Sequence, residues 1–217
     1  MARVNVSQYS SALELSFTDP FSSIYTTNAS APLGVQAGLR YFYDFGLYSY
    51  CAYLNNSQGT CSNMTVGNQY RPYDAITSDM AANYSRITQA LVQGTAFMDS
   101  SSLGSATKAA YWMLLLGTVC ALLAALTGFL KSHFSFFFST IFSVSGSILL
   151  LIGTSIWTII IKKSDGINDL LIGDQADAVP IGIIVTLGNG LHLSWAAFVC
   201  LAVSIVPYII RCVNIHS

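Results

Sequence analysis

Long stretches without charged residues dominate the second half of the chain. Residues 109–130 and 134–161 contain no charged side chain, and residues 178–210 contain only His192, which is neutral at its usual pKa. A helix rises about 1.5 Å per residue and the bilayer core is about 30 Å thick, so about 20 apolar residues suffice to cross it. The pattern therefore predicts transmembrane helices at 109–130, 134–161 and 191–210.

Short polar segments connect these predicted helices. Residues 131–133 leave room only for a tight turn, so the first two helices are expected to form an antiparallel hairpin. Residues 162–190 form a longer loop, in which the apolar run 183–187 predicts a short strand leading into the third helix. Residues 211–217 form a short tail.

Small residues follow one face of each helix in the predicted hairpin. They are Gly117, Ala121, Ala125 and Gly128 in the first helix, and Ser135, Ser139, Ser143 and Ser147 in the second. Small side chains let helix backbones approach closely in lipid. We interpret both faces as packing surfaces, and the alternative is a polar stripe that lines a pore.

The first 108 residues are more polar and predict a separate domain that begins with β structure. Residues 13–17 alternate between apolar and polar side chains, and residues 40–54 are rich in Tyr and Phe, as half-buried strands are. Residues 55–59 predict a turn. A helix is expected near 74–99, with Asp74 as its N-cap and Ile76, Met80, Ile87 and Leu91 on one face.

Composition agrees with a membrane protein. Of the 217 residues, 53% are hydrophobic and only 9% are charged, whereas a soluble domain carries about a quarter charged residues. The net charge is -1 and no basic cluster occurs, so no nucleic-acid partner held by phosphate contacts is expected.

The N-terminal domain carries the marks of an extracytoplasmic location. It contains all five Asn-x-Ser/Thr glycosylation acceptors, at Asn5, Asn28, Asn55, Asn63 and Asn83. Cys51 and Cys61 lie in the same domain with nine residues between them, and a disulfide between them would close a hairpin of a kind found in secreted proteins. Three tryptophans fall at the span ends on this same side, as in an interfacial aromatic belt: Trp112, Trp157 and Trp195.

The distribution of basic residues mildly favours the opposite orientation. With the N-terminal domain outside, two basic residues flank the spans on the cytosolic side, and three, Lys108, Lys162 and Lys163, lie outside. We give more weight to the glycosylation acceptors and cysteines, so the C-terminus is expected in the cytosol. Cys212, beside Arg211 at the cytosolic boundary, is then either a palmitoylation candidate or an unmodified thiol.

No signal peptide or signal anchor precedes residue 109 in this sequence. Export of the N-terminal domain behind a later span is uncommon. We therefore hypothesise that the natural protein has a further transmembrane helix ahead of this sequence.

One motif resembles a known family. Gly46-Leu47-Tyr48-Ser49-Tyr50-Cys51, followed by Cys61, is similar to the G-L-W-x-x-C…C signature of claudin-type proteins. These have four transmembrane helices, with the signature in the first extracellular loop. The surrounding residues 40–45, 71–76 and 187–198 most resemble the fungal branch, which comprises the actin-cortical-patch (eisosome-associated) proteins and the PalI pH-response regulators. Tyr48 stands where animal claudins carry Trp, which weakens any analogy with tight-junction sealing.

The resemblance implies a fold and site residues. The fold would be a mainly α claudin-like transmembrane bundle, with three of four helices present, under an extracellular β-rich domain. Cys51 and Cys61 would form the loop disulfide, and Gly46, Leu47 and Tyr48 would seat the loop on the helices.

The resemblance also implies a function. It indicates a non-enzymatic plasma-membrane organising protein of fungal cortical membrane subdomains, cell-wall integrity or morphogenesis. Membrane lipids, lateral protein partners or further copies of the chain, and cell-wall material would be its partners. The alternatives are an accessory component of ambient-pH signalling and a modulatory subunit of a channel.

The residues provide no pattern for catalysis, a metal or a cofactor. The three histidines, His133, His192 and His216, are scattered without ligand spacing. Four aspartates crowd the second loop without the spacing of a calcium-binding loop, at Asp165, Asp169, Asp174 and Asp177. We interpret them as a solvated loop, with a weak cation contact or a partner surface as the alternative. Cys120 and Cys200 fall within spans and are interpreted as packed thiols.

Overall fold

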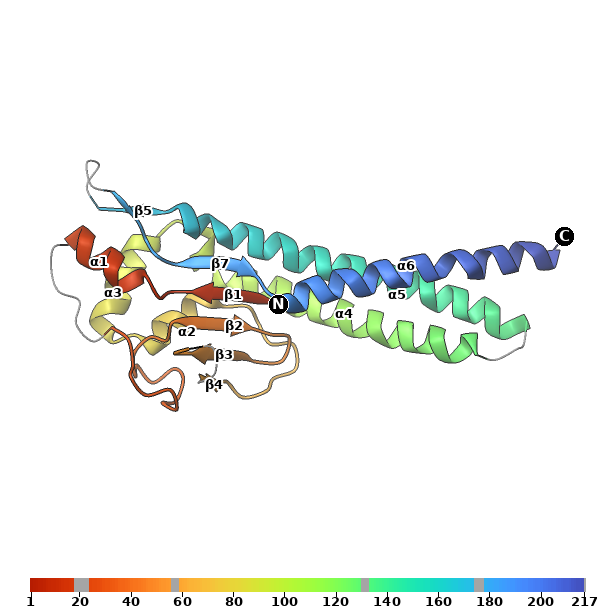
Figure 1. Cartoon of the computed structure of the whole chain (residues 1–217), viewed down its shortest axis with the longest axis horizontal. Coiled ribbons are helices and arrows are strands. Elements are labelled where there is room, and N and C mark those ends of the chain that lie inside the picture. The colour runs from red at the N-terminus through yellow and green to blue at the C-terminus, as the bar shows by residue number, and fades with distance from the viewer. Residues whose placement is uncertain (18–23, 56–58, 130–132, 174–177, 217) are drawn as a thin grey trace.

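The structure is a computed structural model, and it describes residues 1–17, 24–55, 59–129, 133–173 and 178–216. At the helix ends 133–134 and 206–216 only the backbone is described. Three long helices lie side by side and extend from a head that contains the sheets and the shorter helices (Figure 1). The described chain is mainly helical.

The three long helices are α4 (Ser100–Gly128), α5 (His133–Ser164) and α6 (Asn189–His216). The antiparallel hairpin predicted for the first two is present, and both are longer than the spans expected within them. α4 begins nine residues earlier because Asp99 caps it, with its carboxylate accepting a hydrogen bond from the Ser102 amide at 3.1 Å. The head therefore packs on the ends of the same helices that extend away from it.

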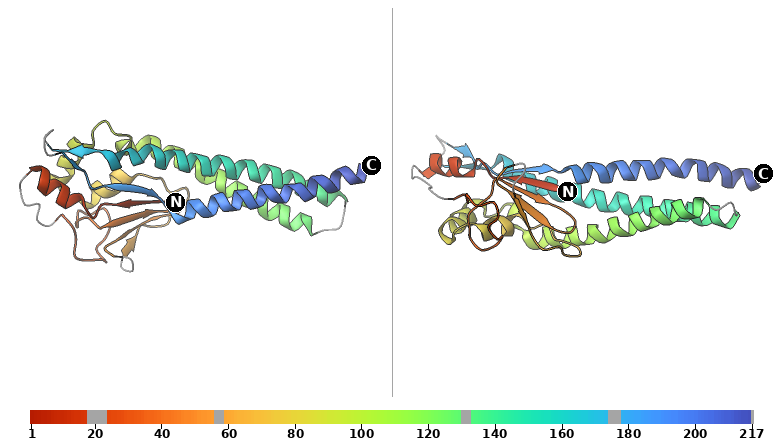
Figure 2. Two further views of the ribbon diagram at one scale, coloured as in Figure 1. Left: turned by 45° about the horizontal axis from the view of Figure 1, so that its top comes forward. Right: turned by 60° about the horizontal axis from the view of Figure 1, so that its bottom comes forward.

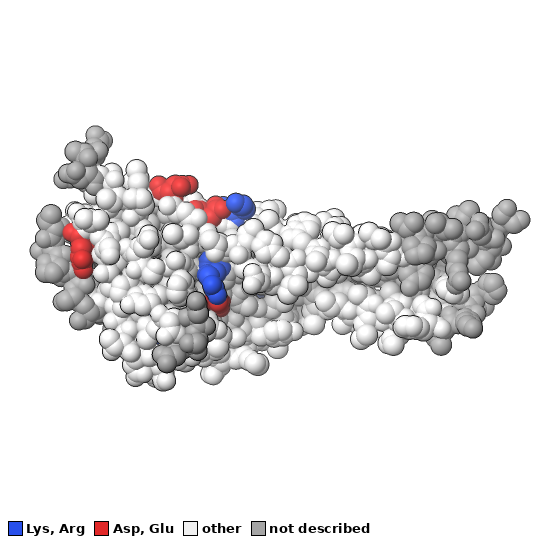
Figure 3. Space-filling model, in the orientation of Figure 1, with Lys and Arg blue, Asp and Glu red and all other residues white. Residues whose placement is uncertain are grey.

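α4 and α5 are long and apolar enough to cross a membrane, each with a mean hydropathy of 2.1 over its most apolar window. The described apolar part of α6, Asn189–Ile205, is shorter. On the face shown in Figure 3, the charged side chains lie over the head, and the described surface of the helices beyond it carries none. The number of spans stays a prediction.

Small residues bring the helices together, as predicted. Ser139, Ser143 and Ser147 are buried, and the Ser139 hydroxyl donates to the carbonyl of Ala124 at 2.8 Å. A Cβ atom added at Gly153 would lie 2.8 Å from Leu114, so the glycine is required for this approach. The packing interpretation is confirmed for these residues, and it is wrong for Ala125, which is exposed while its neighbour Ala124 faces the interface.

The head contains a five-stranded antiparallel sheet with the order β4-β3-β2-β1-β7. Its strands are β1 (Ala2–Asn5), β2 (Phe42–Phe45), β3 (Tyr50–Tyr53), β4 (Gly59–Cys61) and β7 (Ile184–Leu187). The strands predicted within 40–54 and at 183–187 are thus present. β1 pairs Ala2 with Phe45 on one side and with Leu187 on the other, so it joins the first residues of the chain to the loop before α6.

The remaining elements of the head are short. They are α1 (Tyr9–Phe17), α2 (Pro72–Asp79), α3 (Ala82–Val92), the 3₁₀ helices η1 (Ala96–Met98) and η2 (Asp165–Asp169), and a two-stranded sheet of β5 (Leu171–Ile172) and β6 (Val179–Pro180).

Three predictions for the head are wrong. Residues 13–17 belong to a helix and not to a strand, because Tyr9, Ala12 and Leu13 bury one helical face. The helix expected over 74–99 is broken into three pieces, with extended backbone at Met80 and Ala81. Asp74 is not the N-cap either: it lies in the first turn of α2, and Arg71 holds the cap position.

The three tryptophans do not share one environment. Trp112 is 46% exposed, whereas Trp157 is fully buried and packs against Tyr70, with 5.9 Å between the ring centroids. The indole nitrogen of Trp195 donates to the Thr158 hydroxyl at 3.1 Å. The C-terminal end of α5 therefore belongs to the core of the head. The prediction of an interfacial belt is wrong for Trp157.

Candidate functional site

A disulfide closes one edge of the sheet. Cys51 on β3 and Cys61 on β4 are direct cross-strand partners, and their sulfur atoms are bonded. In the chain-entropy description, a crosslink that closes so short a loop stabilises the fold by about 2–3 kcal/mol. The pairing implied by the resemblance is confirmed. It bonds β4, a three-residue strand at the sheet edge, covalently to β3, which is its one neighbour in the sheet.

The predicted signature residues form the turn between β2 and β3. The Gly46 amide donates to the carbonyl of Ser49 at 2.9 Å, and a Cβ atom at Gly46 would lie 3.0 Å from that same oxygen. Leu47 packs against the head core. The Tyr48 ring stands edge-on against Tyr111 of α4, with 5.5 Å between centroids. The turn thus contacts the helix where it leaves the head, and its role as a seat stays a prediction.

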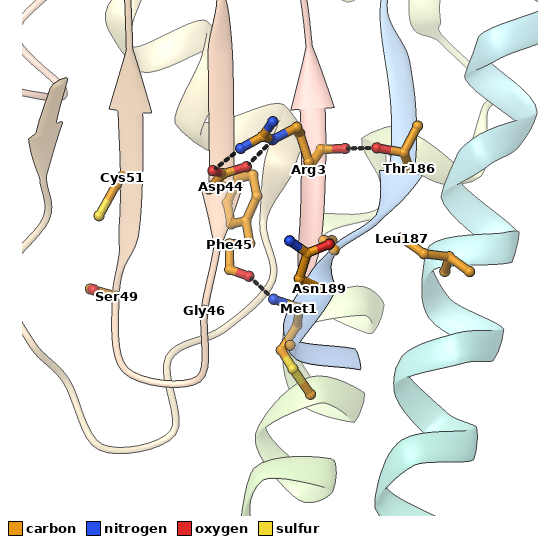
Figure 4. A pocket seen from close by; sticks show the side chains of 13 residues that line it. Met1, Arg3, Asp44, Phe45, Gly46, Ser49, Cys51, Thr186, Leu187 and Asn189 are labelled. Carbon is orange, nitrogen blue, oxygen red and sulfur yellow. Dashed lines mark hydrogen bonds and ion pairs between the residues drawn. The ribbon is translucent and has the colours of Figure 1, made fainter. Parts of the chain in front are cut away.

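An open cavity of about 500 Å³ lies beside this turn (Figure 4). Arg3 and Asp44 form a two-bonded ion pair on its wall, at 2.6 and 2.7 Å, and the Arg3 guanidinium lies 5.8 Å from the centre of the Phe42 ring. The end of β7 and the start of α6 also line the cavity, with Thr186 beside Arg3 and with Asn189. The pair neutralises its own charges, and no described lining residue is a histidine or a free thiol.

A buried ion pair inside the head was missed by the sequence analysis. Arg40 and Asp79 are both fully buried, and their side chains meet at 3.1 Å. The Asp79 carboxylate also accepts from the Tyr43 hydroxyl at 2.8 Å and from the Gly34 amide at 2.6 Å. Arg40 donates in addition to the carbonyl of Ala31. The network joins β2, the end of α2 and the long segment between α1 and β2.

The same network controls the ionisation of one tyrosine. Burial, and then the nearby Asp79 carboxylate, raise the pKa of Tyr43 well above its ordinary value. Tyr43 therefore stays a hydrogen-bond donor to Asp79 at physiological pH. In the sequence, Arg40 stands next to a predicted strand, but nothing links it to Asp79, which lies 39 residues away.

The five glycosylation candidates fall into two classes. Asn28, Asn55, Asn63 and Asn83 are exposed on the head. Asn5 is only half exposed, because it pairs with Phe42 of β2 and Ile184 of β7. Its side-chain oxygen also accepts a hydrogen bond from the Ser7 amide at 2.9 Å. The four exposed residues have room for a glycan in the folded head, whereas Asn5 is held between two strands.

The other candidate residues form no site in the described part of the chain. Within it, no three His, Cys, Asp or Glu side chains gather as a metal site would require. Asp165 pairs with Lys162 at 3.1 Å, while Asp174 and Asp177 lie outside the described residues. The side chain of Cys212 likewise lies outside them.

The comparisons with known proteins identify the family. A family model described as the SUR7/PalI family matches residues 2–210, which is nearly the whole chain. The chain belongs to the SUR7/PalI family. The claudin-like resemblance seen around Cys51 is thereby confirmed. Comparisons with curated proteins and with solved structures found no match.

Membership in the SUR7/PalI family limits the general class of function. Together with the two long apolar helices, it indicates a membrane protein. The SUR7/PalI family is not a known enzyme family, and membership is consistent with a membrane-organising or pH-response role.

Proposed function

We propose that this SUR7/PalI-family protein is a non-enzymatic organiser of the fungal plasma membrane, acting in cortical membrane subdomains, cell-wall integrity or morphogenesis. The division of side chains on the helices carries the proposal. Their small residues face one another, and rows of large apolar side chains face outward, including Leu122 and Leu126 on α4, Ile148 and Ile152 on α5, and Val199 and Val203 on α6. Such faces suit lipids and laterally packed proteins, including further copies of the chain.

The head supports the same proposal. Its sheet is crosslinked by a disulfide and its polar network is buried, from which we infer a rigid head at the ends of the helices. A rigid head can contact neighbours or cell-wall material without any chemistry. We place the head outside the cell and the C-terminus in the cytosol, because a disulfide and exposed glycosylation acceptors both belong to that side.

The orientation gives a testable prediction for glycosylation. In yeast, the protein is expected to lose apparent mass on treatment with a glycosidase that removes N-linked glycans. Asn28→Gln, Asn55→Gln and Asn83→Gln should each remove one step of that shift, because these side chains are exposed. Asn5→Gln should change nothing, because Asn5 is held within the sheet. Absence of any shift in the unmutated protein would contradict an outside head.

The organising role predicts slow lateral movement. The full natural protein, tagged at its cytosolic end in the native cell, is expected to form stable plasma-membrane patches that recover slowly after photobleaching. Cells without the protein should be more sensitive to agents that stress the cell wall. Uniform and rapid diffusion, with normal growth of the deleted strain under wall stress, would overturn the proposal. An unrelated plasma-membrane protein with the same tag serves as the control.

A further inference from the structure

Four large hydrophobic side chains of the head and α4 are exposed near one another. Met64 is 86% exposed, Val66 68%, Tyr48 47% and Trp112 46%. Single exposed hydrophobic residues are common on protein surfaces and require no explanation. A group of four on adjoining segments does, because exposed hydrophobic residues that gather in one region mark contact surfaces. We call these four residues the apolar edge.

Contacts between the segments bring these residues together. The amide of Thr65, between Met64 and Val66, donates to the carbonyl of Tyr48 at 2.7 Å. The Tyr48 ring meets Tyr111 at 5.5 Å, and Tyr111 meets Trp112 at 5.4 Å. On the other side of the loop, Gly67 lies against the Lys108 stem and Tyr111, at 3.3 and 3.5 Å from an added Cβ atom. The loop 62–67 and the β2–β3 turn are therefore docked on α4.

The position along α4 decides what the apolar edge faces. Lys108 is the last charged residue of α4, and the uncharged run of the helix follows it immediately. Trp112 comes one turn later, which is where tryptophan marks the boundary between headgroups and acyl chains. Both views in Figure 2 place the end of the sheet that carries the β2–β3 turn where the long helices leave the head. The apolar edge is thus continuous with the surface that α4 presents to lipid.

We propose that the apolar edge inserts into the interfacial layer of the bilayer, in the leaflet on the side of the head. The chemistry suits that layer: Tyr and Trp combine an apolar ring with a polar atom, and Met and Val provide apolar area without charge. The head then contacts the membrane directly, and this contact fixes its height and tilt relative to the bilayer. This inference requires only that α4 crosses a bilayer, and it does not depend on the organising role.

Fluorescence quenching by lipids tests the proposal. The single-cysteine variants Met64→Cys and Val66→Cys are prepared in a chain whose free thiols have been replaced (Cys120→Ala, Cys200→Ala, Cys212→Ala), labelled with bimane, and reconstituted into phosphatidylcholine nanodiscs. Leu15→Cys is the matched control, because Leu15 is 67% exposed but lies on α1, at the far end of the head (Figure 1). Mass spectrometry checks that Cys51 and Cys61 remain bonded.

Lipids with a nitroxide near the headgroup are expected to quench labels at 64 and 66 several-fold more than the label at 15, and more strongly than nitroxides deep in the acyl chain. Equal quenching at all three positions would overturn the proposal. The emission of the labels at 64 and 66 could instead shift as in an apolar environment, in proportion to protein concentration and without quenching by lipid. That result would also overturn the proposal and would indicate contact with a second copy. As a further test, Met64→Asp should reduce quenching of a label at 66 while leaving the unfolding temperature unchanged.

Discussion

Replacing Asp79 with alanine is expected to destabilise the head by about 3–5 kcal/mol, the cost of leaving a buried charge without its partner. Arg40 would stay fully buried with no counter-ion, and the Tyr43 hydroxyl and the Gly34 amide would each lose an acceptor. Thermal unfolding of the detergent-solubilised protein and protease resistance of the head would measure the loss. We expect a large fall in the unfolding temperature and rapid cleavage between residues 24 and 40.

The exposed ion pair of Arg3 and Asp44 provides the matched control. Its side chains are 50% and 33% exposed, whereas those of Arg40 and Asp79 are fully buried. Asp44→Ala should therefore cost only about 0–1 kcal/mol, as exposed pairs do. The double replacement Arg40→Met with Asp79→Leu should recover much of the stability lost by Asp79→Ala, because it removes both buried charges. Similar losses for Asp79→Ala and Asp44→Ala would contradict the importance of burial.

Gly146→Leu is expected to separate the three long helices. A Cβ atom at Gly146 would lie 3.1 Å from both the Cys120 Cβ and the Gly117 carbonyl of α4, and 3.2 Å from Leu201 of α6. A leucine cannot fit there without moving both neighbours, and overpacking of this kind costs about 1–3 kcal/mol or more. We expect a lower unfolding temperature and a broadened or aggregated peak in size-exclusion chromatography.

Ser145→Leu is the control for a larger side chain, because Ser145 immediately precedes Gly146 on α5 and is exposed. It adds a similar side chain to the outward face and should leave the unfolding temperature nearly unchanged. If Gly146→Leu behaved like Ser145→Leu, the close approach of the helices would not matter for stability. If both variants aggregated, the outward face at Ser145 would be an interface as well.

The sequence predicted the features that depend on long or repeated patterns. The uncharged runs predicted the long helices, and the aromatic run over 40–54 predicted β2 and β3. Short patterns were less reliable, because five alternating residues at 13–17 also suit one face of a helix such as α1. The chain breaks after α2 although no Gly or Pro occurs there: Met80 is fully buried and its backbone is extended. Packing of this kind has no local signal.

The candidate site was predictable only where a motif marks it. The cysteines and the turn before them were found through a motif; the structure bonds the cysteines across β3 and β4 and packs Tyr48 of the turn against Tyr111 of α4. The Arg40–Asp79 pair was not found, because its partners are far apart in sequence and each resembles an ordinary surface residue. The apolar edge was not found either, because exposed Met64 and Val66 look like core residues until the fold is known.

The central place of β1 in the sheet has a consequence for the order of synthesis. β1 needs β7 as its second neighbour, and the paired residues Ala2 and Leu187 lie almost the whole chain apart. At 5–20 residues per second, roughly 10–40 seconds pass between the appearance of the two strands. During that time β1 has an unpaired edge, while α4 and α5 are being synthesised. The head can therefore complete its sheet only after most of the helical part has been made, and a chaperone that shields strand edges would help most in that interval.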